Sequence, residues 1–192
     1  MRPALSPPNV LTYIRIGLTP LVVQLILWNR CGSALAVIAI AGGTDGIDGF
    51  LARRYQWSTR LGAYLDPIAD KLLLTSVYLC LGFTSLVPSS LVWLILARDA
   101  AILSMSAAAL AFTNFRIFPP TRLGKLSTFL QIVLALLVLG RCGLPPAIPA
   151  EAVTAGIWTT AAATAGSGIQ YVARGVRMFL TCKGVLPGRE SR

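Results

Sequence analysis

Four aspartates lie close together in a chain that has only seven acidic residues. Asp45 and Asp48 come first, and Asp66 and Asp70 follow after a short interval. Because no histidine occurs in the chain and no cysteine lies between these aspartates, oxygen atoms are the available ligands there, and a set of oxygen ligands favours Mg²⁺ or Mn²⁺ over Zn²⁺. Four carboxylates in apolar surroundings repel one another unless cations lie between them or some are protonated. The segment therefore predicts a site for hard divalent ions.

The spacing brings these side chains onto shared helix faces. At about 100° per residue, Gly62, Asp66 and Asp70 lie on one face of a helix. The same geometry places a second set on one side of the preceding helix, namely Asp45, Asp48, Gly49, Ala52 and Arg53. Two helices joined by a short loop can thus gather the four carboxylates around one cavity.

The residues beside the aspartates indicate phosphoryl transfer. Arg53 is a cation suited to phosphate, and Gly49 and Gly62 leave room for a ligand next to the helix backbone. Divalent ions can neutralise a pyrophosphate and make a nucleotide leaving group viable. An acceptor hydroxyl must also lose a proton, and Asp70 is our choice of general base because no histidine is available.

The elements that must position this site are membrane helices. The chain is 55% hydrophobic and 12% charged, with a mean hydropathy of +0.71, which is too apolar for a soluble domain. A span takes about 20 apolar residues, so we expect an all-α, polytopic membrane protein with six transmembrane helices in a single domain, 1–192. The expected spans are 11–28, 33–52, 61–83, 91–112, 126–139 with a start extended by 120–125, and 152–172.

Two helix starts depend on single residues. Asn9 can cap the first helix. Asp66 with Pro67 could likewise begin a helix, but that interpretation leaves the other aspartates unexplained, so we expect the third helix to begin near Ser58 or Thr59.

Positive charge predicts the orientation of these spans. One side collects fourteen basic residues and the other only Arg30 and Arg141, while Arg98 lies within the membrane. The fourteen are Arg2, Arg15, Arg53, Arg54, Arg60, Lys71, Arg116, Arg122, Lys125, Arg174, Arg177, Lys183, Arg189 and Arg192. Cytoplasmic loops carry the excess of Lys and Arg, so both termini are expected in the cytoplasm, in a bacterial inner membrane or its equivalent. This distribution does not favour a nucleic-acid partner.

The same topology bears on two further pairs of residues. Cys31 and Cys142 fall on the same outer side, so they could form a disulfide if that side is oxidising. Arg98 and Asp99 project about 100° apart on a helix, so we expect them to pair with other groups rather than with each other. Whether their role is structural or catalytic stays open.

The ordered string of spaced residues resembles the complete signature of the CDP-alcohol phosphatidyltransferases. Its members are Asp45, Asp48, Gly49, Ala52, Arg53, Gly62, Asp66 and Asp70. The resemblance implies that the four aspartates bind two ions, Mg²⁺ or Mn²⁺, that Asp70 acts as general base, and that CMP is released from CDP-diacylglycerol. It also implies a CDP site at Asp45, Gly49, Ala52, Arg53 and Gly62, a homodimer and contact with membrane lipids.

Other segments bear on the acceptor alcohol. Residues 8–12 and 66–71 are similar to those of bacterial phosphatidylglycerophosphate synthases and CMP-forming cardiolipin synthases. Arg98 with Asp99, and residues 120–131, resemble the cardiolipin synthases more, which implies phosphatidylglycerol as acceptor, with glycerol 3-phosphate as the alternative. Arg116, Arg122 and Lys125 are topology charges by default, yet they cluster where an anionic acceptor would enter. A cation or proton carrier is the alternative from another class, because the same carboxylates could bind ions in transit.

Overall fold

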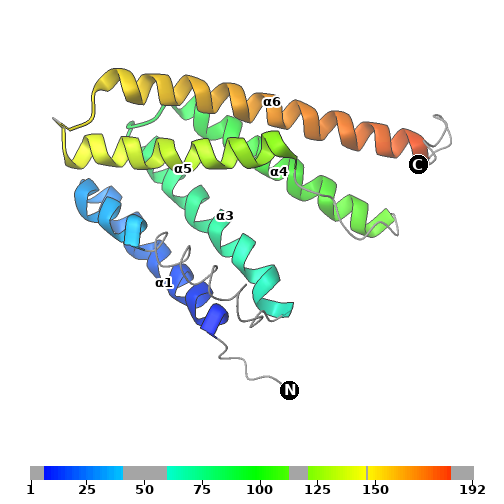
Figure 1. Cartoon of the computed structure of the whole chain (residues 1–192), viewed down its shortest axis with the longest axis horizontal. Coiled ribbons are helices and arrows are strands. Elements are labelled where there is room, and N and C mark those ends of the chain that lie inside the picture. The colour runs from blue at the N-terminus through cyan, green and yellow to red at the C-terminus, as the bar shows by residue number, and fades with distance from the viewer. Residues whose placement is uncertain (1–6, 41–59, 113–120, 146, 183–192) are drawn as a thin grey trace.

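The computed structural model describes residues 7–40, 60–112, 121–145 and 147–182, with side chains for 16–40, 70–105, 121–145 and 147–175. Within these ranges every regular element is a helix, which confirms the all-α fold class for the described part of the chain (Figure 1). The helices are α1 (Pro7–Leu27), a helix described over Cys31–Ile40, α3 (Arg60–Phe83), α4 (Ser89–Phe112), α5 (Arg122–Gly143) and α6 (Ala150–Cys182).

The helix ends follow local chemistry. The chain turns between α1 and the next helix at Asn29, whose φ of 58° lies in the left-handed region that Asn tolerates better than most residues. At the other end, α1 begins at Pro7, because proline needs no intrahelical partner in the first turn. Asn9 therefore lies inside the helix, and the prediction that it caps α1 is wrong.

The starts of α3 and α5 agree with the expected elements. Because α3 begins at Arg60, Asp66 and Pro67 lie inside the helix, and the interpretation of Asp66 as an N-cap is excluded. Thr121 caps α5: its Oγ1 atom accepts a hydrogen bond of 2.9 Å from the backbone N–H of Gly124.

The helices pack as two groups. α1 packs against α3, while α6 packs against both α5 and α4, and smaller contacts join α3 to α4 and α5. The ribbons of α1 and α3 lie close to the others near the C-terminal ends of α1, α3 and α5, and they diverge toward the N-terminal ends of α1 and α3 (Figure 1). The described helices thus meet at one end and diverge toward the other.

A buried apolar cluster fills the joined end. Its members come from five helices and include Val22, Ile26, Ala34, Val77, Leu81, Ile95, Leu134 and Leu139. A disulfide between Cys31 and Cys142 links the second helix to α5 across 111 residues of chain. The sequence-based placement of these two cysteines on one side of the protein is therefore confirmed.

Backbones meet directly beside this disulfide. A Cβ atom added to Gly143 would lie 2.5 Å from the Gly32 nitrogen and 2.6 Å from its Cα atom. A Cβ atom added to Gly32 meets nothing nearer than 3.8 Å. The close approach thus depends on glycine at position 143 alone.

Only α5 among the described helices is both long and apolar enough, taken by itself, to be a candidate membrane span. The stretches Ile16–Leu27 and Cys31–Ile40 are apolar but shorter. The six expected spans therefore have one clear counterpart in the part of the chain that the structure describes.

We predict that Gly143→Ala lowers thermal stability, because the new methyl group collides with backbone that cannot move aside cheaply. Overpacking of this kind costs about 1–3 kcal/mol. Gly32→Ala is the matched control and should leave the melting temperature within about 2 °C of wild type. Thermal unfolding of both variants in detergent tests this contact, and equal melting temperatures for the two would contradict it.

Candidate functional site

α3 carries two of the four aspartates, at positions 66 and 70, one turn apart. The side chain of Asp70 is exposed. Asp45, Asp48, Gly49, Ala52 and Arg53 lie outside the described residues, as do the side chains of Gly62 and Asp66. No group of three possible metal ligands occurs among the side chains that the structure describes. The metal site, the CDP site and the role of Asp70 as base therefore stay predictions.

Lys71, the residue after Asp70, belongs to a cluster of three charged side chains with Arg98 and Asp99. The Nζ atom of Lys71 on α3 lies 2.5 Å from Oδ1 of Asp99 on α4. Nη1 of Arg98 donates to the same oxygen at 2.8 Å. Two cations thus share one carboxylate oxygen, which leaves the cluster with one net positive charge.

The prediction that Arg98 and Asp99 do not pair with each other is wrong. Their Cα–Cβ directions diverge around the helix, but the long side chain of Arg98 reaches back to its neighbour's carboxylate. The accompanying prediction that they pair with other groups is confirmed, because Asp99 binds Lys71 and Arg98 binds residues of α5 and α6.

The Arg98 guanidinium joins three helices. The residue is 6% exposed, and its Nε and Nη2 atoms donate to Oγ of Ser167 on α6 at 3.2 and 3.1 Å. Nη2 also donates to the carbonyl oxygen of Gly124 on α5 at 3.2 Å. The ring centroid of Tyr171 lies 5.9 Å from Cζ, a distance at which cation–π attraction operates. The planar fork of arginine suits this set of acceptors.

Tyr171 also holds the start of α5. Its hydroxyl oxygen accepts a hydrogen bond of 3.2 Å from the backbone N–H of Thr121, the residue that caps α5. A Cβ atom added to Gly124 would meet the Tyr171 hydroxyl and the Thr121 Oγ1 atom, each at 3.0 Å. The first turn of α5 is therefore fixed closely against α6.

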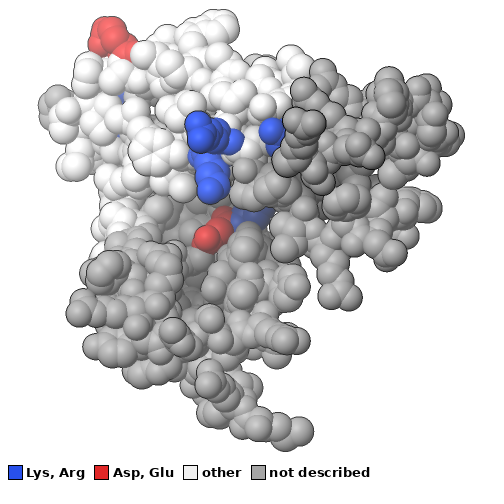
Figure 2. Space-filling view, turned by 45° about the vertical axis from the view of Figure 1, so that its right-hand side comes forward, with Lys and Arg blue, Asp and Glu red and all other residues white. Residues whose placement is uncertain are grey.

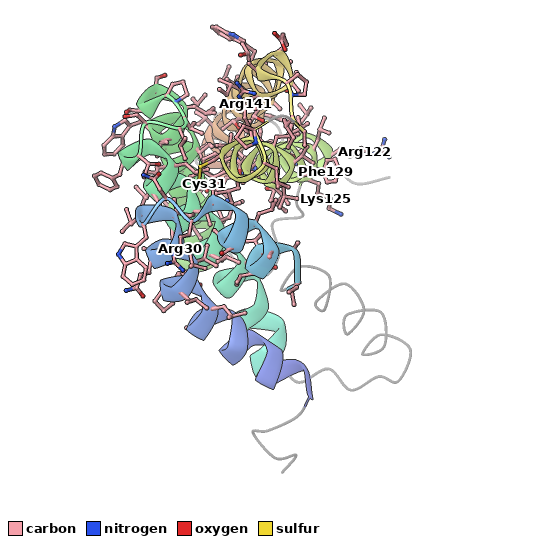
Figure 3. The ribbon with its side chains drawn as sticks, turned by 90° about the vertical axis from the view of Figure 1, so that its left-hand side faces the viewer. Arg30, Cys31, Arg122, Lys125, Phe129 and Arg141 are labelled. Carbon is pink, nitrogen blue, oxygen red and sulfur yellow. A yellow bond between two sulfur atoms is a disulfide. The ribbon has the colours of Figure 1, made fainter. Side chains whose placement is uncertain are left out.

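Two of the predicted acceptor-binding cations begin α5. Arg122 and Lys125 are exposed, and Figure 3 shows them projecting from the same side of the helix as Phe129, which is 61% exposed. Figure 2 shows described basic side chains gathered near acidic ones at the middle of one face. Arg116, the third predicted cation, lies outside the described residues. The first turns of α5 thus present positive charge followed by apolar surface.

Comparison with known proteins decides the family. The family model described as CDP-alcohol phosphatidyltransferase matches residues 5–165, a range that contains all four aspartates. The chain belongs to the CDP-alcohol phosphatidyltransferase family.

Individual relatives of this phosphatidyltransferase carry two kinds of name. The chain is 35% identical to a rat "Cardiolipin synthase (CMP-forming)" over 147 residues, which cover 66% of this chain and 47% of the rat protein. It is 34% identical to the human protein of that name, with 66% and 48% covered. It is 36% identical to a Mycobacterium tuberculosis "Probable phosphatidylglycerophosphate synthase" over 179 residues, which cover 88% of this chain and 81% of that one. The chain thus spans about half the length of the mammalian relatives.

Sequence reasoning missed the partners of the charged cluster. Ser167 belongs to a row of polar side chains between α5 and α6, in which the Ser127 and Thr164 hydroxyls lie 3.1 Å apart and Nε2 of Gln131 donates to Thr164 at 3.3 Å. The available signal was the recurrence of small polar residues in apolar helices, which is typical of helix–helix contacts in membranes.

We predict that Arg98→Lys destabilises the protein by at least about 2 kcal/mol, because a single ammonium group cannot bind Asp99, Ser167 and the Gly124 carbonyl together. Arg174→Lys, an exposed change of the same kind on α6, is the control and should unfold like wild type. Unfolding midpoints in the same detergent compare the two, and an unchanged midpoint for Arg98→Lys would show that the buried network does not hold the helices.

Proposed function

We propose that this phosphatidyltransferase moves the phosphatidyl group of CDP-diacylglycerol onto an acceptor alcohol and releases CMP. The observation that carries this proposal is the family match over residues 5–165, which includes the full series of aspartates from Asp45 to Asp70. In the reaction the acceptor oxygen forms a bond to the phosphatidyl phosphorus while the bond from that phosphorus to the oxygen of CMP breaks.

Divalent ions fit the residues present. The candidate ligands, Asp45, Asp48, Asp66 and Asp70, supply only oxygen atoms, the set that Mg²⁺ and Mn²⁺ prefer. Two such ions, when bound, would neutralise the pyrophosphate of the donor. The protein's own residues would bind the nucleotide through Arg53 and accept the proton of the acceptor hydroxyl at the carboxylate of Asp70.

We propose further that the chain crosses the membrane six times with both termini in the cytoplasm. The disulfide supports this orientation, because disulfides persist in oxidising compartments. Its two cysteines directly follow Arg30 and Arg141, the two basic residues of the sparsely charged side. The lopsided distribution of Lys and Arg supports a cytoplasmic location for the opposite side, which carries the aspartates.

Phosphatidylglycerol is the first choice of acceptor, which would make the protein a cardiolipin synthase. The mammalian relatives with that name support this choice. The surface of α5 supports it too, since Arg122 and Lys125 suit an anionic head group and the exposed Leu126, Phe129 and Ile132 that follow suit acyl chains. Glycerol 3-phosphate is the second choice, favoured by the longer match to the mycobacterial relative.

We predict that Asp70→Asn lowers kcat at least about a hundredfold, because removal of a general base costs that much or more. Nucleotide binding in the presence of Mg²⁺ should survive better in Asp70→Asn than in Asp45→Asn, which loses a ligand that does not act as base. CMP release from CDP-diacylglycerol measures turnover, and titration with a CDP analogue measures binding. Turnover of Asp70→Asn at the wild-type rate would remove the assignment of the base.

The acceptor is identified by offering phosphatidylglycerol and glycerol 3-phosphate separately to the purified enzyme with CDP-diacylglycerol and Mg²⁺. We expect cardiolipin as the product. The double variant Arg122→Gln, Lys125→Gln should raise KM for the acceptor about fivefold, on the order of 1 kcal/mol for exposed charges, with KM for the donor unchanged. Arg30→Gln, at the disulfide end, is the control. An equal rise in both KM values would argue against acceptor binding at the start of α5.

A further inference from the structure

Two polar side chains on the same face of α3 bind residues of the neighbouring helices α4 and α5. Lys71 binds Asp99 on α4, and the hydroxyl of Tyr78 donates a 2.7 Å hydrogen bond to the backbone carbonyl oxygen of Gln131 on α5. Seven residues complete almost two turns, so these two positions lie within about 20° of each other around the helix axis. They therefore anchor the same face of α3.

The aspartates of α3 lie to one side of this anchored face. Counted around the helix from Lys71, position 70 is about 100° away and position 66 about 140° away in the same direction. A rotation of α3 would therefore swing both carboxylates relative to the rest of the bundle. The contacts that fix the rotation of α3 therefore also set the direction of Asp66 and Asp70, the two proposed metal ligands on this helix.

The two residues next to Lys71 point away from the apolar cluster, although Leu73 and Leu74 pack partly against it. Asp70 is exposed and Leu72 is 47% exposed, so the two neighbours of Lys71 are not enclosed by other helices. Enclosed packing begins further along, at Val77 and Tyr78, which are 2% and 0% exposed. Next to the aspartates, the bond from Lys71 to Asp99 is a directed contact that resists rotation of α3.

The partner of Lys71 is itself held in place. The oxygen of Asp99 that binds Lys71 also accepts from Arg98, and the Arg98 guanidinium is bound to Ser167 on α6 and to the Gly124 carbonyl on α5. A continuous series of polar contacts thus runs from α5 and α6 through α4 to the residue next to Asp70. Such a series is direction-specific, whereas apolar contacts are not.

We propose that Lys71 and Asp99 are positioning residues: their ion pair, together with the hydrogen bond of Tyr78, sets the rotation of α3 and so directs Asp66 and Asp70 toward the ions and the donor diphosphate. The inference rests on the proposed function. It gives the charged cluster a role in metal binding beyond holding the helices together.

The test separates positioning from stability by measuring metal binding directly. Mn²⁺ binding to the full-length protein in detergent is followed by electron paramagnetic resonance with CDP present, beside thermal unfolding and CMP release. We expect Lys71→Met and Asp99→Asn each to weaken Mn²⁺ binding about tenfold, or about 1.4 kcal/mol, and to raise the Mg²⁺ concentration for half-maximal activity in parallel. Lys71→Arg, which keeps the ion pair, should stay within about threefold of wild type.

Arg30→Met is the matched control, an exposed cation at the disulfide end whose loss should leave Mn²⁺ binding unchanged. If Lys71→Met does not fold, Tyr78→Phe replaces it, because it removes one hydroxyl and keeps the ring; about a threefold loss of Mn²⁺ affinity is then expected. A lower melting temperature with wild-type Mn²⁺ affinity would overturn the proposal.

Failure of the proposed function gives a different pattern. Wild-type protein that binds Mn²⁺ but releases no CMP from CDP-diacylglycerol would remove the transferase activity, while weaker Mn²⁺ binding in Lys71→Met would still support the positioning role. Wild-type protein that binds no Mn²⁺ would overturn both.

Discussion

A positive charge buried between helices governs the arrangement of this bundle. Burying the guanidinium of Arg98 without acceptors would cost several kcal/mol. Its donors therefore require the carboxylate of Asp99, the hydroxyl of Ser167 and the backbone carbonyl of Gly124 at fixed distances. These acceptors lie on three different helices. The hydrogen bonds of the one Arg98 side chain therefore fix how α4, α5 and α6 are positioned along one another.

The described helices pack differently at the two ends of the bundle. At the joined end, a disulfide, a glycine contact and a buried apolar cluster hold the α1 and α3 group against the other helices. Toward the N-terminal ends of α1 and α3 the ribbons diverge. Asp70, in the middle of α3, is exposed.

Much of the fold could be predicted from the sequence because apolar segments of the right length are separated by prolines and glycines. Most described helices begin and end within a few residues of the expected bounds, and the placement of Cys31 with Cys142 on one side followed from topology alone. The exception is α6, which continues to Cys182, although its span was expected to end at residue 172. The error at Asn9 came from reading a capping residue without allowing for prolines that start a helix earlier. These features depend on local sequence, which is why sequence reasoning largely succeeds with them.

Contacts between helices were harder to predict. Arg98 pairs with its neighbour because a long flexible side chain can fold back, which helix angles alone do not reveal. The bond between Lys71 and Asp99 depends on how α3 and α4 are rotated, a property that no single segment encodes. For the site itself, the spacing of the aspartates led to the family, and the comparisons confirm that family. The arrangement of the four carboxylates stays a prediction, since three of the four side chains lie outside the described residues.

The central claim is that ordered aspartates persist at a lipid boundary because divalent ions lie among them. A crystal structure with Mn²⁺ and CDP-diacylglycerol, with the ions located by anomalous scattering, tests this most directly. The account predicts two Mn²⁺ peaks, each within about 2.0–2.2 Å of carboxylate oxygens from the set Asp45, Asp48, Asp66 and Asp70, with Lys71 still bound to Asp99. Carboxylates that point in unrelated directions, too far apart to share a cation, would contradict it.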